Sequence, residues 1–271
     1  MRGSLGEKIG EGVFADVHAW APGQVVKLFK AGVSRRLSGH EARMTRAVFA
    51  AGGPAPEVLD KVTLDGRFGI VLPRFDGPTL LQLSRSGGVT REQAGAILAT
   101  LYMAVHKTPP PPDVLPLRDW MDGALRSNAD RIPKHIATGI LALIDHLAPG
   151  DGLCHVDLHP GNVIMTAEGP RLIDWPFVVR APAALDLAQA HVALSEIAPD
   201  VVDDPERPRA LNAAVQSEYA RLAGMSPASL TAATQLYLPI ARTWFLTGPV
   251  PSPAQRERLI ERIEAALRSE D

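Results

Sequence analysis

The sequence has one cysteine, few aromatic residues, no excess of either charge and no long hydrophobic run. Cys154 stands alone among 271 residues, so no disulfide can close within the chain, which fits a reducing compartment. With 28 basic and 30 acidic residues, the chain lacks the positive surplus that holds a polyanion, and we expect no nucleic-acid partner. No apolar run approaches the roughly 20 residues that span a bilayer, and the start MRGSLGEKIG lacks a secretory signal's apolar stretch. These absences predict a cytoplasmic protein with no membrane contact.

The first quarter of the chain is typical of strands around one helix. Short β-rich segments alternate with Gly and Pro, and a helical pattern follows from Ser34 to Ala51. Asp65-Gly66 is a strong hairpin turn between the last two strands. The predicted strands are Lys8–Ile9, Ala15–Trp20, Gln24–Phe29, Val58–Leu64 and Phe68–Leu72.

The rest of the chain is predominantly helical. Thr90 and Gln93 form a capping box for a helix that we expect to reach Lys107. Further helices are predicted near Leu117–Arg131, near Pro133–Leu147 and from Ala184 onward, whereas residues 153–174 break the pattern. We therefore predict an α+β chain of two lobes: a small β-rich lobe with one helix over residues 1–76 and a large α-rich lobe over 77–271. The Pro- and Gly-rich residues 73–78 would form the hinge.

The interruption in the helical lobe carries the strongest chemical signal. Residues 155–162 contain the pattern H-x-D-x-x-x-x-N, and Asp174 follows Asn162 by twelve residues. Phosphoryl transfer by a kinase needs one carboxylate to accept the proton of the attacking hydroxyl, and an amide oxygen and a second carboxylate to hold Mg²⁺. We assign the first role to Asp157 and the metal to Asn162 and Asp174. Alone, Asp157 or Asn162 could simply shape a turn.

Two further elements fit the same chemistry. The segment around Gly10 and Gly12 matches a Gly-rich phosphate loop except that Ala15 replaces the third glycine, a change expected to affect nucleotide affinity modestly. Lys27 lies in an apolar strand, where a lysine is costly to bury without a partner, and Glu41 in the following helix would be that partner. Lys30 is the rival candidate, and a Lys27 side chain pointing into solvent is the alternative.

In this order the pieces resemble the aminoglycoside phosphotransferase and choline kinase family, which has a protein-kinase-like fold. The similarity covers about residues 10–188. The segments that carry it are His40–Arg43, Pro54–Leu59, His155–Asn162, Ile173–Trp175 and Leu185–Ala188. The resemblance implies ATP or GTP as donor, Mg²⁺, and transfer to a hydroxyl of a small molecule such as an aminoglycoside-like antibiotic, an aminosugar or an amino alcohol. It also implies that the hinge near Arg74 and Phe75 binds the nucleotide base, and that Asp186 braces the catalytic loop without reacting.

Two departures from protein kinases favour a small acceptor. Val156 precedes Asp157, where many protein kinases carry an arginine that receives an activating phosphate. Only twelve residues separate Asp174 from Asp186, too few for a peptide-docking activation segment. A protein serine/threonine kinase and a nucleotide-binding pseudokinase with a regulatory role are the alternatives. No obligate protein partner is evident. The acceptor, the choice between ATP and GTP, a resistance or metabolic role and the oligomeric state stay open.

Two groups in the helical lobe have ordinary explanations as well as functional ones. An acidic run, with Glu196 and Asp200 among its members, would attract a cationic acceptor or simply face solvent. Trp120, Trp244 and Phe245 would line an acceptor pocket or pack in the core, and core packing is the preferred interpretation.

Overall fold

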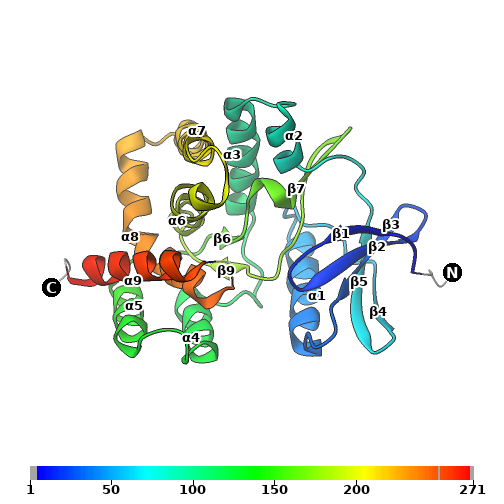
Figure 1. Cartoon of the computed structure of the whole chain (residues 1–271), viewed down its shortest axis with the longest axis horizontal. Helices are drawn as coiled ribbons and strands as arrows, with labels where there is room; N and C mark the ends of the chain where they lie inside the picture. Colours follow the sequence, from blue (N-terminus) through cyan, green and yellow to red (C-terminus); the bar gives the residue numbers. More distant parts are fainter. Residues whose placement is uncertain (1–4, 250, 269–271) are drawn as a thin grey trace.

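A computed structural model describes residues 5–249 and 251–268, and it confirms the α+β class (Figure 1). The N-terminal part is an antiparallel sheet with the strand order β1-β2-β3-β5-β4, against which one helix, α1 (Arg35–Ala50), packs. Ala42 of α1 joins a small buried cluster with Ala15, Phe29 and Ile70 of the strands. The strands are β1 (Lys8–Glu11), β2 (Ala15–Ala21), β3 (Gln24–Phe29), β4 (Asp60–Leu64) and β5 (Arg67–Pro73).

The C-terminal part is helical around the short strands of the predicted interruption. Two small antiparallel ladders pair β6 with β9 and β7 with β8. The strands are β6 (Leu153–Cys154), β7 (Val163–Thr166), β8 (Gly169–Leu172) and β9 (Val179–Arg180). The helices are α2 (Leu80–Ser86), α3 (Arg91–Lys107), α4 (Leu117–Ser127), α5 (Lys134–His146), α6 (Ala184–His191), α7 (Glu206–Ala223), α8 (Pro227–Thr247) and α9 (Pro253–Arg268). Three short helical segments complete the lobe: η1 (Pro160–Asn162), η2 (Val192–Ile197), which is π-helical, and η3 (Ala198–Val201). No helix within the described residues combines the length and apolar character needed to cross a membrane.

The structure differs from the predicted helices at α2 and at the end of α4, and it is π-helical over Val192–Ile197. Helix α2 was not predicted, although Thr79 and Gln82 form a complete capping box at its start. Helix α4 ends at Ser127 rather than Arg131, because the chain turns at Asn128, whose side-chain amide donates back to the carbonyl of Ala124. Seven residues of α2 are too few to show a clear hydrophobic period in the sequence.

The segment with the catalytic pattern lies between two hydrophobic clusters of the helical lobe. Leu153, Leu158 and Trp175 belong to the cluster that includes α3 and α7. Cys154 and Val156 belong to the cluster that includes α5, α8 and α9. Because successive residues of this segment point into different cores, packing fixes its path from both sides.

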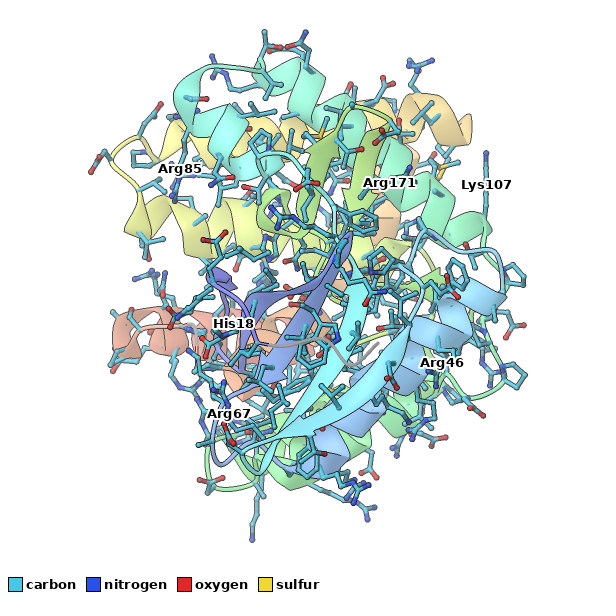
Figure 2. All side chains as sticks on the ribbon, turned by 90° about the vertical axis from the view of Figure 1, so that its right-hand side faces the viewer. His18, Arg46, Arg67, Arg85, Lys107 and Arg171 are labelled. Atoms are coloured by element: carbon cyan, nitrogen blue, oxygen red, sulfur yellow. The ribbon has the colours of Figure 1, made fainter. Side chains whose placement is uncertain are left out.

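The predicted hinge is held against the helical lobe after it leaves the sheet. The amide of Met165 in β7 donates to the carbonyl of Pro78 (2.9 Å). Gly77 has a φ of 151°, and a Cβ there would lie only 1.9 Å from the Met165 carbonyl oxygen. Only glycine permits this close approach. Figure 2 looks onto the β-rich lobe, with Arg67 toward one end of the sheet and Arg171 of β8 toward the other.

Candidate active site

Lys27 joins the two lobes through two carboxylates. Its Nζ donates to Glu41 Oε1 of α1 and to Asp174 Oδ1 of the helical lobe, at 2.7 Å each. The side chain of Lys27 is 16% exposed and that of Glu41 is 6% exposed, so both charges are largely shielded from water. The predicted pairing of Lys27 with Glu41 is therefore present, and Asp174 joins it.

The electrostatics of this triad keep Lys27 charged. Burial alone would lower its pKa, but the carboxylates of Asp174 and Glu41 outweigh burial and raise the pKa of Lys27. Burial raises the pKa of Glu41, with Asp174 adding to the rise and Lys27 opposing it. Lys30, the rival candidate, is bound instead to exposed Glu11 at 3.0 Å. Of the two lysines, only Lys27 contacts Asp174, the residue predicted to bind the metal.

Asp157 and Asn162 form the second half of the site. The Asn162 side-chain amide donates to the Asp157 carbonyl at 2.9 Å and approaches Asp157 Oδ2 at 3.4 Å. The amide of Ile173, the residue before Asp174, donates to the Asn162 carbonyl at 2.9 Å. The β7–β8 hairpin thus places Asn162 beside the strand end that carries Asp174. Together these contacts connect Lys27, Glu41, Asp157, Asn162 and Asp174 into one continuous group.

The environment of the Asp157 carboxyl shifts its pKa upward. The surrounding protein raises the pKa of Asp157, first by restricting water around the carboxyl and then through the charge of Asp174. His159, whose Nε2 lies 3.8 Å from Asp157 Oδ1, and the Asn162 amide act in the opposite direction. The side chain is still 40% exposed, so an acceptor can reach it.

Asp186 of α6 holds the backbone that presents Asp157. Its Oδ2 accepts from the amide of His155 at 2.8 Å and its Oδ1 from the amide of Val156 at 2.7 Å. Val156 has a φ of 70°, a conformation that costs a β-branched residue of order 1–3 kcal/mol. The two bonds to a buried carboxylate hold Val156 in this conformation, and they place Asp186 as a support behind the loop.

Three supporting residues were not predicted from the sequence. Tyr102 of α3 donates its hydroxyl to the Leu158 carbonyl at 2.7 Å. One turn further on, His106 bonds Asp186 Oδ2 at 3.1 Å through Nε2 and the Tyr219 hydroxyl at 2.8 Å through Nδ1. Tyr102 and His106 are four residues apart and therefore lie on one face of the helix. This spacing was the signal in the sequence that could have identified them. Helices α3 and α7 therefore act on the loop through hydrogen bonds as well as packing.

The residues around Asp174 are held by aromatic packing. Trp175 is fully buried, and its ring lies edge-on to that of His155 with centroids 4.5 Å apart. His155 is also fully buried, and burial lowers its pKa to about 4, so it stays neutral at neutral pH. His155 Nδ1 accepts from the Asp157 amide at 3.2 Å. His155 therefore supports the loop through packing and a hydrogen bond.

The Gly-rich segment forms the end of β1, which contains Gly10, and the turn that begins at Gly12 and leads to β2. Gly12 donates its amide to the Ala15 carbonyl at 2.8 Å, and neither Gly10 nor Gly12 has a positive φ. Glu11 between them is bound by Lys8 and Lys30. The Ala15 side chain is buried in the sheet–helix core. Its methyl group therefore points into the lobe.

Within the described part of the chain, no hydrogen bond or ion pair joins the hinge residues Arg74 and Phe75 to the Lys27–Asp174 group. The Arg74 amide donates to the Gly23 carbonyl, and its side chain binds exposed Asp76 at 2.7 Å. The Arg171 guanidinium lies 5.9 Å from the centre of the Phe75 ring. Both side chains are therefore engaged at the edge between the lobes, and their role toward a nucleotide base stays a prediction.

The donor set suits Mg²⁺, an ion that prefers hard oxygen ligands. Asp174 is 34% exposed, so its carboxylate is accessible from solvent. The Asn162 amide nitrogen faces Asp157, which turns its oxygen away from that residue. A different cluster, His106, Cys154 and Asp186, also has ligand atoms within 4.8 Å of one another. There burial raises the pKa of the Cys154 thiol, and both Asp186 oxygens already accept hydrogen bonds, so that cluster is structural.

Comparison with solved structures finds the same fold. An aminoglycoside-3'-phosphotransferase of type VIII is 20% identical over 88% of this chain and 94% of its own, with a TM-score of 0.57. The APH(3'')-Id enzyme of Streptomyces rimosus, solved with ADP and streptomycin, is 19% identical over 88% and 91%, with a TM-score of 0.58. A choline/ethanolamine kinase family protein of Mesorhizobium loti is 19% identical over 97% and 87%, with a TM-score of 0.53. These likenesses confirm the predicted two-lobed, kinase-like fold.

Sequence comparison identifies the family. No curated protein matches the sequence. Residues 15–225, which include Lys27, Glu41, Asp157, Asn162 and Asp174, match the model of the phosphotransferase enzyme family. Since the match covers more than half of the chain, it confirms the resemblance that the motifs suggested, and the protein belongs to the phosphotransferase enzyme family.

Proposed function

We propose that this protein moves the γ-phosphate of ATP or GTP to a hydroxyl of a small molecule, with Asp157 as base. The observation that carries the proposal is the continuous group of Lys27, Glu41, Asp174, Asn162 and Asp157 between the sheet and the helical part. We further propose that residues 1–76 bind the nucleotide and 77–271 provide catalysis and the acceptor site, in the cytoplasm. The outermost residues of both ranges lie outside the described part of the chain.

In the proposed reaction, Lys27 and the segment around Gly10 and Gly12 hold the phosphates, and Glu41 keeps Lys27 in place. Asp157 accepts the proton of the acceptor hydroxyl as its oxygen bonds to the γ-phosphorus. The bond from that phosphorus to the bridging oxygen breaks, and the nucleoside diphosphate leaves. Such catalysis consists mainly of positioning and charge stabilisation, which the fixed loop around Asp157 supports.

Asn162 and Asp174 would hold Mg²⁺ in this site. When bound, the ion neutralises charge on the β- and γ-phosphates. Asp174 contacts Lys27 as well, so its carboxylate connects the phosphate-binding lysine to the metal position. Near Arg74 and Phe75, the hinge backbone would receive the nucleotide base.

Small acceptors are favoured by the short segment between Asp174 and Asp186. Trp175, Val178, Val179 and Ala181 of this segment are buried, and its β9 strand pairs with β6. A packed segment of this length offers no extended surface for a protein substrate. The similar solved structures include aminoglycoside phosphotransferases and a choline kinase, whose names refer to small molecules.

Replacing Asp157 with asparagine tests the base assignment. General-base catalysis contributes about 10²–10⁴-fold, so we expect Asp157→Asn to reduce turnover by about that factor. The dissociation constant of Mg-ADP, measured by calorimetry, should change less than about threefold because Lys27 and Asp174 are intact.

Asp151→Asn is the matched control, since that carboxylate lies close by in sequence and is 95% exposed. It should leave turnover unchanged. Full turnover by Asp157→Asn would remove Asp157 from the proposed mechanism.

A further inference from the structure

Three aromatic rings outside the assigned group gather beside the catalytic segment. The rings of Trp120 in α4 and Trp244 in α8 lie 4.2 Å apart between centroids, inclined by 35°. Phe177 meets Trp244 edge-on at 5.1 Å. All three side chains are half-buried, with one side packed on the helical core and part of the surface open to solvent. We call Phe177, Trp120 and Trp244 the aromatic shelf.

The aromatic shelf is close to the reacting groups. Phe177 follows Asp174 by three residues, a stretch of chain that spans at most about 11 Å. The next residues form β9, which pairs with β6 immediately before the catalytic loop. The Arg180 amide in β9 donates to the Leu115 carbonyl, which brings the start of α4 to the same place. The shelf therefore belongs to the part of the helical lobe that borders Asp157 and Asp174.

Two carboxylates of the acidic run that would suit a cationic acceptor are paired with arginines. Glu196 is 5% exposed and is bound by Arg242 at 2.8 Å and by Arg262 at 3.0 Å. Asp200, another member of the acidic run, is bound by Arg258. Two arginines for the one buried carboxylate leave a net positive charge at this position.

More positive charge faces the C-terminal end of α8, the helix that carries Trp244. The Arg131 guanidinium donates to the Thr247 and Gly248 carbonyls at 2.9 and 2.8 Å. Arg256 donates to the Leu246 carbonyl at 2.7 Å. A polycation placed on the aromatic shelf would approach these guanidinium groups and would be repelled.

From these contacts we infer that the acceptor is a hydroxyl compound with a flat aromatic or apolar ring and without several positive charges. Its ring packs on Phe177 and Trp244, because aromatic faces bind planar apolar groups with little loss of conformational entropy. Its hydroxyl then lies toward Asp157, which takes the proton as the oxygen–phosphorus bond forms and the nucleoside diphosphate leaves. This inference rests on the proposed function and narrows its acceptor class.

Equilibrium binding tests the inference without any need for turnover. The full chain is loaded with Mg²⁺ and the non-hydrolysable ATP analogue AMP-PNP, and titrated calorimetrically with phenyl β-glucoside and methyl β-glucoside. These two probes differ only in the ring. We expect at least tenfold tighter binding of the phenyl compound, and weaker binding of kanamycin, a polycation, and of choline, a single cation.

Variants test whether the gain in affinity from the phenyl ring arises at the aromatic shelf. Phe177→Leu and Trp244→Leu keep apolar volume but remove the aromatic faces, and each should abolish most of the tenfold difference. Trp20→Leu, which removes a half-buried tryptophan from β2 in the sheet, should keep that difference. AMP-PNP affinity and the melting temperature report whether each variant is folded. If only one shelf variant folds, that variant alone tests the inference.

The inference is overturned if kanamycin or choline binds more tightly than phenyl β-glucoside, if the ring gives no gain, or if both folded shelf variants keep the gain. The proposed function fails separately, if the chain does not bind Mg-AMP-PNP or if Asp157→Asn keeps full turnover.

Discussion

At the scale of single residues, the site depends on charges that are stable only in each other's presence. Lys27 has two carboxylate partners from different lobes, and Glu41 is nearly buried. The sequence allowed this pairing to be predicted because a lysine in an apolar strand requires a countercharge. Asp174 as a second partner could not be deduced, because it depends on how the lobes meet.

The Lys27→Met variant should weaken nucleotide binding and lower stability for two different reasons. Losing a charged hydrogen bond to phosphate costs about 1.5–3 kcal/mol, so the KM for nucleotide should rise about 10- to 100-fold. The melting temperature should fall, because Glu41 and Asp174 then face each other without a cation. Adding Glu41→Gln should restore part of the melting temperature but not the KM.

Lys30→Met is the matched control for this change. Lys30 is 36% exposed and pairs with an exposed carboxylate, so its loss should cost no more than about 1 kcal/mol. An equal rise in KM for Lys30→Met and Lys27→Met would contradict the role of Lys27.

His155 predicts how stability depends on pH. An unfolded chain protonates this histidine near its ordinary pKa of 6.5, whereas burial lowers the folded pKa to about 4. Between these values the unfolded state binds more protons, so the free energy of unfolding falls as the pH decreases, by at most roughly 3 kcal/mol from this group. Urea denaturation at several pH values between 7 and 4 measures this decrease in the free energy of unfolding.

His155→Phe keeps a ring against Trp175 and removes the titration. In that variant the pH-dependent loss should shrink by the His155 contribution. An unchanged slope of stability against pH would show that His155 does not stay neutral in the folded protein.

At the scale of elements, the catalytic loop is held through its backbone. Asp186 binds two consecutive amides, Asn162 binds the Asp157 carbonyl and Tyr102 binds the Leu158 carbonyl. The spacing of the motif predicted the loop and its reacting residues. It did not predict Tyr102, His106 or Tyr219, because their role depends on how α3 and α7 pack against the loop.

Asp186→Asn should weaken catalysis and spare nucleotide binding. An asparagine offers one acceptor oxygen for two amides, so Val156 loses part of what holds its unfavourable φ. Losing a charged hydrogen bond costs about 1.5–3 kcal/mol. Where that cost raises the activation free energy, turnover falls about 10- to 100-fold. Turnover and the Mg-ADP dissociation constant measure the two effects.

Asp145→Asn serves as control, because Asp145 is 55% exposed and pairs with Arg118 on the surface. It should leave both quantities unchanged. A large loss of Mg-ADP affinity in Asp186→Asn would contradict a role confined to the loop.

At the scale of the whole molecule, the alternation of strands and helices predicted the class and the order of the lobes. The sheet, α1 and the capping box of α3 lie where local patterns placed them. Helix α2, the early end of α4 and the π-helical segment Val192–Ile197 were missed, since tertiary contacts decide short or irregular elements. The ion pairs of Glu196 were also hidden, because their arginines come from α8 and α9, more than forty residues away.

The central claim is that one Mg-nucleotide is bound jointly by Lys27, Asn162 and Asp174, with Asp157 facing its γ-phosphate. A crystal structure of the full chain with Mg²⁺ and AMP-PNP tests it most directly. We expect the metal on Asn162 and Asp174, Lys27 on the phosphates, and the Asp157 carboxylate turned toward the space in front of the γ-phosphorus. Nucleotide bound elsewhere, or a metal held without Asn162 and Asp174, would contradict the account.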